Sequence, residues 1–169
     1  MMAIDLGRAP TASFEPTAAH ELMRSFAGQW QGPTRVWLEP GAPPEESVTE
    51  LCAESVLGGR WLRLSYRGTA FGKPHAGEML VGFQKDAREY ELAWIDSAHT
   101  GSAIMLSTGV ARQDGVVDVL GSYAAGEQRW GWRTRLRRPA PDTLSLEAFN
   151  VAPDGAEHRS IASLLARVG

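Results

Sequence analysis

The sequence holds a single cysteine, Cys52, among its 169 residues. A lone cysteine cannot form an intramolecular disulfide, and it argues against a cysteine-based zinc site. Long apolar runs are also missing. No stretch approaches the roughly 20 apolar residues of a membrane helix, and residues 1–15 lack the apolar segment of a secretory signal. These absences predict a cytoplasmic protein that does not associate with a membrane.

Neither sign of charge dominates the chain. The net charge is −3, with 22% charged and 43% hydrophobic residues, which is typical of a globular protein rather than a disordered one. The longest basic run consists of Arg129, Arg133, Arg135, Arg137 and Arg138. On a strand, the first four of these side chains share one face that carries no aromatic platform for stacking bases. We therefore expect no nucleic-acid partner.

Motifs of known chemistry are absent as well. The four histidines, at positions 20, 75, 99 and 158, show no zinc-protease spacing. No nucleophile elbow, phosphate-binding loop or dinucleotide fingerprint occurs. The sequence thus gives no reason to expect a metal or a cofactor, and it assigns no catalytic residue.

Alternating hydrophobicity and turn chemistry are what the chain does have. The expected strands cover residues 29–38, 47–57, 60–69, 76–85, 89–96, 102–111, 116–123, 128–137, 143–150 and 158–167. Asp114-Gly115 and Asp154-Gly155 are the strongest hairpin signals between them. About ten strands without long helices between them predict an all-β, up-and-down antiparallel barrel. Ten tilted strands enclose more space than side chains usually fill, so we expect a cavity.

One short helix precedes the first strand. Apolar residues recur at helical spacing over residues 17–26, with Thr17 suited to the N-cap and Gly28 to the end. Residues 1–16 mix Gly7, Pro10 and Pro16 with small polar residues and are expected to form a flexible N-terminal arm. Residues 17–169 then form a single barrel domain.

Alternation also predicts which side chains point inward. Trp130 and Trp132 oppose the arginine face of their strand, and buried arginines would be very costly, so the tryptophans should face the interior. The same argument applied to two other strands completes the candidate ligand-binding set: Leu64, Tyr66, Trp94, Asp96, Trp130 and Trp132. Aromatic walls with a few polar groups are usual in small-molecule sites. Two simpler interpretations are that the aromatics only fill the core and that Asp96 caps a turn.

Several motifs, in order, resemble a known family. They are Leu22 to Gly32 with Trp37 and Pro40-Gly41, Val56 to Leu62, Gly72-Lys73-Pro74 with Gly77, Gly82-Phe83, Tyr90 to Ser97, Asp154-Gly155 and Arg167. Together they resemble the bacterial "domain of unknown function 1579" family, although Phe83 to Asp86 departs from its pattern. The resemblance implies a calycin-like barrel, similar to lipocalins and fatty-acid-binding proteins, with no established reaction. It also implies that Arg167 packs over Trp30 at one end of the barrel.

A second resemblance is narrower. Gly28-x-Trp30-x-Gly32 is similar to the opening of nitrobindin-type haem barrels, but Thr34 stands where those proteins have a further glycine. The resemblance implies haem ligation by a histidine near the last strand, here His158, because imidazole is a suitable axial ligand.

The function we expect is binding of a small apolar or amphipathic molecule in an aromatic-lined cavity. Three alternatives stay open. One is the haem barrel with His158, and another is a barrel enzyme that uses Asp96, His99 or Tyr66 as acid–base groups. The third is a homodimer that pairs through outward-facing Trp37 and Trp61.

Overall fold

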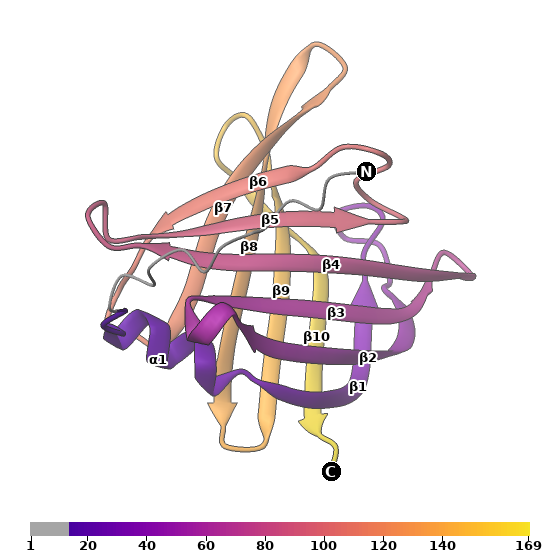
Figure 1. Cartoon of the computed structure of the whole chain (residues 1–169). Coiled ribbons are helices and arrows are strands. Elements are labelled where there is room, and N and C mark those ends of the chain that lie inside the picture. The colour runs from indigo at the N-terminus through magenta and orange to yellow at the C-terminus, as the bar shows by residue number, and fades with distance from the viewer. Residues whose placement is uncertain (1–13) are drawn as a thin grey trace, which may run out of the picture.

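Ten antiparallel strands close into one barrel in this computed structural model, which describes residues 14–169 (Figure 1). Each strand pairs with its neighbours in sequence, and β1 pairs with β10 to close the sheet. The strands are β1 (Gly28–Val36), β2 (Glu45–Val56), β3 (Trp61–Ala70), β4 (Lys73–Gln84), β5 (Glu89–Asp96), β6 (Met105–Val110), β7 (Val116–Ala125), β8 (Gln128–Ala140), β9 (Thr143–Val151) and β10 (Glu157–Arg167). The up-and-down barrel expected from the alternation is therefore confirmed.

The alternation of β8 is also confirmed. Trp132 and Leu136 are buried, at 6% and 3% exposure. Arg133, between them, points outward and donates from Nε to Asp118 Oδ1 at 2.7 Å. Because each arginine finds water or a carboxylate outside, the strand can bury its inner face, on which Thr134 is the polar residue between Trp132 and Leu136.

The helix α1 (Ala18–Ser25) lies across one end of the barrel and packs against β2, β3 and β4 (Figure 1). Its Met23 is 1% exposed, and Phe26, which follows the helix, is fully buried. Burial of two large apolar side chains stabilises this end by about 1.5–3 kcal/mol each. The helix expected over residues 17–26 is therefore confirmed.

Arg167 and Trp30 lock the helix end. The guanidinium carbon of Arg167 lies 4.2 Å from the Trp30 ring centre, and Nη1 donates to the Ala27 carbonyl at 3.1 Å. Trp30 Nε1 donates to the Phe26 carbonyl at 2.9 Å. Gly28 makes room for this contact, because a Cβ there would lie 2.2 Å from Arg167 Nη1 and its φ is +145°.

The other end of the barrel is open and is flanked by two projecting features. The β7–β8 hairpin extends beyond the other strands at the top of Figure 1. The second feature is the loop 97–104, because β6 begins at Met105 rather than at residue 102 as the sequence suggested. Asp96 holds this loop by accepting the N–H groups of Ala98 and His99.

The expected N-terminal arm lies mostly outside the described residues, since only 14–16 of it are described. Phe14 contacts His20 edge-on with ring centres 4.8 Å apart, and Lys85 Nζ donates to the Glu15 carbonyl. Within residues 14–169, no helix combines the length and the apolar character needed to cross a bilayer.

Candidate functional site

Asp96 is the centre of a hydrogen-bonded cluster at the open end. It is the last residue of β5, and its side chain is 1% exposed. Oδ1 accepts the backbone N–H groups of Ala98 at 2.6 Å and His99 at 2.8 Å, while Oδ2 accepts the Tyr66 hydroxyl at 2.5 Å. Asp96 therefore caps a turn, which is one of the two simpler interpretations of the sequence. It also holds the Tyr66 side chain of β3 in place.

The same carboxylate fixes the orientation of His99. Burial alone would raise the pKa of Asp96, but hydrogen bonds from His99, from Tyr66 and from the backbone N–H groups of Ala98 and His99 hold it well below its usual range. An ionised carboxylate only accepts hydrogen bonds, so His99 Nδ1, 3.0 Å from Oδ1, is the donor. In the neutral ring Nε2 is then an acceptor, and it has no hydrogen-bond partner within residues 14–169.

Tyr66 connects the carboxylate to the aromatic wall. Burial, together with the negative charge of Asp96, raises the pKa of Tyr66 far above its usual value, so the hydroxyl remains a donor to Asp96. The same oxygen accepts Trp94 Nε1 at 2.7 Å. Gly77 leaves space for Tyr66, since a Cβ at Gly77 would lie 2.2 Å from the hydroxyl oxygen.

A second histidine approaches Asp96 from the start of β4. His75 Nε2 lies 3.6 Å from Asp96 Oδ2, and the His75 side chain is 9% exposed. Burial is the largest cause and lowers the pKa of His75. The negative charge of Asp96 raises this pKa in part, and the neighbouring His99 lowers it. His75 Nδ1 is buried without a hydrogen-bond partner in the described part of the chain.

Trp94 and Trp132 form a stacked pair beside this cluster. Their ring centres are 5.1 Å apart at an interplanar angle of 20°, an arrangement that aromatic pairs favour when offset. The His99 ring lies against both, with its centre 5.8 Å from Trp94 and 6.0 Å from Trp132. Three aromatic rings and one carboxylate thus share the open end of the barrel.

The tryptophan pair separates two spaces. The inner one, which we call the lumen cavity, is only about 30 Å³, room for about one water molecule, because large side chains fill the barrel. The outer one, the mouth pocket, is about 680 Å³. Its walls above the tryptophan pair include Phe71, His99, Ile104, Met105, Tyr123 and Asn150. Of these two spaces the mouth pocket is by far the larger, and the interior holds less space than the strand count suggests.

Comparison with known proteins places the chain in a family. A family model described as "Protein of unknown function (DUF1579)" matches residues 15–167. The chain belongs to the DUF1579 family. The family resemblance seen in the sequence is thereby confirmed. The family's description assigns it no reaction. No curated protein matches the chain.

Two solved structures resemble this DUF1579 barrel. One is Rv2717c from M. tuberculosis, with a TM-score of 0.58, 19% identity, and coverage of 92% of this chain and 100% of that one. The other is the S-type phycobiliprotein lyase CPES from Guillardia theta, with a TM-score of 0.58, 13% identity, and coverage of 90% and 94%. Similarity at these identities shows the shared fold, which agrees with the calycin-like barrel implied by the sequence.

The DUF1579 structure brings four of the six predicted site residues together: Tyr66, Trp94, Asp96 and Trp132. Leu64 is fully buried in the core and lines neither the lumen cavity nor the mouth pocket. Trp130 pairs with Tyr123 on the projecting hairpin and also lines neither space. Trp130 is half-buried on the projecting hairpin, so the described contacts do not bring it into the cluster around Asp96.

Two residues of the cluster were not among the six. His99 follows Asp96 by three residues, and the geometry shows that this spacing closes a hydrogen bond. His75 reaches the cluster through the pairing of β4 with β3 and β5, where Gly77 lies opposite both Tyr66 and Asp96. No local pattern in the sequence predicts such a meeting of three strands.

His158 and metal binding can be judged from the same geometry. His158 is on β10, opposite Asn150 of β9. It lines neither the lumen cavity nor the mouth pocket. An axial haem ligand has to face the haem directly, so this position does not fit haem ligation within either space. Among residues 14–169, no group of three or more His, Cys, Asp or Glu side chains could hold a metal ion.

Proposed function

We propose that this DUF1579 protein binds a small apolar or amphipathic molecule in the mouth pocket. The observation that carries the proposal is the stacked Trp94–Trp132 pair beneath a pocket of about 680 Å³. A volume of about 300–1,000 Å³ with apolar walls and few polar groups is typical of small-molecule sites. Phe71 and Ile104, at 39% and 64% exposure, provide apolar contacts at the rim.

Polar atoms at the pocket floor favour an amphipathic ligand over a purely apolar one. His99 Nε2 is an acceptor without a protein partner in residues 14–169, and Trp132 Nε1 is a buried donor in the same condition. Leaving a buried polar atom such as Trp132 Nε1 without a partner costs about 1–3 kcal/mol. A ligand hydroxyl or N–H group that reaches His99 would gain a hydrogen bond whose geometry Asp96 has already fixed.

The comparison adds one supporting point. A barrel of the same fold serves in a protein named as a phycobiliprotein lyase, which favours a role in handling a small molecule. The identity of the ligand does not transfer at 13% identity.

A fluorescence titration tests the proposal. N-phenyl-1-naphthylamine, a neutral naphthalene probe, should bind saturably to the wild type. Ile104→Glu places a carboxylate at the rim of the mouth pocket, and we expect it to weaken binding at least tenfold. The matched control is Leu106→Glu, because Leu106 is similarly exposed at 68% but lies on the outer face of the barrel. Equal affinities in the two variants would exclude the mouth pocket as the binding site.

A second candidate function is proton-transfer catalysis. The specific observation is the Asp96–His99 contact, which has the arrangement of a general base and its orienting carboxylate. His99 Nε2 would accept a proton from a water or hydroxyl group in the mouth pocket, and Asp96 would stabilise the resulting imidazolium. Turnover of p-nitrophenyl esters of increasing acyl length would test it. Equal rates in the wild type and His99→Gln would dismiss this candidate.

A further inference from the structure

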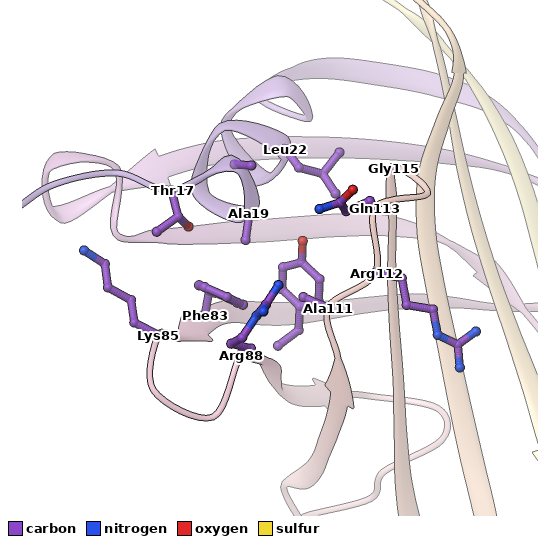
Figure 2. A pocket seen from close by; sticks show the side chains of 12 residues that line it. Thr17, Ala19, Leu22, Phe83, Lys85, Arg88, Ala111, Arg112, Gln113 and Gly115 are labelled. Carbon is purple, nitrogen blue, oxygen red and sulfur yellow. The ribbon is translucent and has the colours of Figure 1, made fainter.

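A second pocket lies at the opposite end of the barrel, beside α1. It has a volume of about 490 Å³, and we call it the helix-end pocket. Its walls come from α1, from the β4–β5 turn and from the segment between β6 and β7 (Figure 2). Tyr90 at the start of β5 lines this pocket, while Trp94 and Asp96 lie at the other end of the same strand. Six residues of extended chain span about 20 Å, so the two pockets are separate.

The apolar part of the helix-end pocket is a continuous surface. Leu22 and Ala19 face it from α1, Phe83 faces it from β4, and Ala111 faces it from the segment after β6 (Figure 2). The Phe83 ring packs on Tyr90 with centres 5.4 Å apart. This surface suits an alkyl chain or an aromatic ring.

Two polar groups in the pocket have no protein partner. Tyr90 is 1% exposed, yet its hydroxyl has no hydrogen-bond partner within residues 14–169. The Arg88 guanidinium forms no ion pair or hydrogen bond with the described residues, and Figure 2 shows it directed into the pocket. A hydroxyl donor and a guanidinium separated by one residue are a suitable pair for a carboxylate or sulfonate.

The surrounding charge has the right sign for an anion. Lys85 lines the same pocket, and its charge helps burial to lower the pKa of His20 on α1. One carboxylate is also near. Burial raises the pKa of Tyr90, and the negative charge of Asp114 raises it further; Asp114 Oδ1 accepts the Val116 N–H at 3.1 Å. Arg112 also belongs to the pocket lining, but Figure 2 shows its side chain pointing away.

From this arrangement we propose that the helix-end pocket binds an amphipathic organic anion, such as a medium-chain carboxylate. Arg88 and the Tyr90 hydroxyl hold the anionic group, Lys85 adds long-range attraction, and the chain lies along Leu22 and Phe83. This site is independent of the mouth pocket and of the function proposed for it.

The probe for the test is 1-anilinonaphthalene-8-sulfonate, which differs from N-phenyl-1-naphthylamine by a sulfonate. Arg88→Gln should raise its Kd about tenfold, and Tyr90→Phe about threefold to tenfold. Arg112→Gln removes the same charge from a side chain that points away, so its Kd should stay within about twofold of wild type. Asp114→Asn should tighten binding, and added salt should weaken it. Decanoate should displace the probe, whereas 1-decanol should not.

The outcomes separate this proposal from the mouth pocket. If the sulfonate probe is lost in Ile104→Glu but kept in Arg88→Gln, it binds at the mouth and the helix-end proposal is overturned. Equal loss in Arg88→Gln and Arg112→Gln would reduce the effect to net charge and would also overturn it. If Arg88→Gln loses binding of the sulfonate probe while Ile104→Glu binds it like the wild type, the helix-end proposal is supported. This holds whether or not N-phenyl-1-naphthylamine binds in the mouth pocket. Tyr90→Phe keeps the buried ring, so it remains informative if larger substitutions disturb folding.

Discussion

Asp96 Oδ1 and His99 Nδ1 lie 3.0 Å apart at the end of β5, and the same carboxylate accepts the Tyr66 hydroxyl. One buried charge therefore sets the position of two side chains and of the loop that follows it. The hydrogen-bond donors around Asp96 stabilise its negative charge. A neutral side chain at this position would leave some of these donors without an acceptor.

Asp96→Asn should reduce the free energy of unfolding by about 2 kcal/mol or more, because an amide cannot accept all of these hydrogen bonds and its NH₂ faces other donors. Urea unfolding followed by tryptophan fluorescence measures this. The control is Asp154→Asn, an exposed hairpin aspartate whose Oδ1 accepts the Ala156 N–H, and its effect should stay within about 0.5 kcal/mol. Equal effects would show that Asp96 is only a turn residue.

The pH dependence near the acid limit provides a related prediction. The pKa of Asp96 lies below its ordinary value in the folded protein, so its contribution to stability is present above about pH 4 and is lost as the pH falls below that. We expect Asp96→Asn to flatten the stability curve between about pH 4 and 2. An unchanged slope in the variant would contradict this.

His75 and His20 predict a second change at milder pH. Burial is the largest cause that lowers the pKa of each below 6.5, so the unfolded chain binds more protons than the folded one as the pH drops from 7 to 5. The free energy of unfolding should therefore fall over this interval, with a contribution from each histidine. His75→Gln should make the decline shallower, which denaturant titrations at a series of pH values would show. A steeper decline in His75→Gln would reverse the sign and refute the assignment.

The lock at the helix end can be tested separately. Arg167→Ala removes the cation–π contact with Trp30 and the hydrogen bond to Ala27, and we expect a loss of about 1–2 kcal/mol. Arg129→Ala is the matched change on an exposed outer position and should cost less than about 0.5 kcal/mol. Thermal unfolding monitored by circular dichroism compares them, and indistinguishable midpoints would contradict the lock.

Haem binding by His158 can be checked directly. Because His158 lines neither pocket, we expect titration with haemin to give the same Soret spectrum for wild type and His158→Ala. A Soret band that shifts or disappears in the variant would show that His158 ligates the iron after all.

The barrel itself could be predicted from the sequence because its cause is local. Alternation such as Trp132 against Arg133 decides which face is buried, and Asp114-Gly115 marks a turn that favours positive φ. The register that brings His75 and Tyr66 to Asp96 was not predictable, because it depends on pairing between β3, β4 and β5. The filling of the lumen also depends on summed side-chain volumes, which alternation does not measure.

The helix-end pocket was missed for a similar reason. Arg88 and Tyr90 are close in sequence, but α1 and the segment before β7 complete their surroundings from distant parts of the chain. A free arginine in a turn looks like any exposed charge until its neighbours are known.

The most direct test of the central claim is a crystal structure of the complex with N-phenyl-1-naphthylamine. The account predicts the naphthalene ring in the mouth pocket, within about 4 Å of Trp132 or His99 and between the side chains of Phe71 and Ile104. Saturable binding in solution, with the probe found only in the helix-end pocket or on the outer face near Leu106, would contradict it.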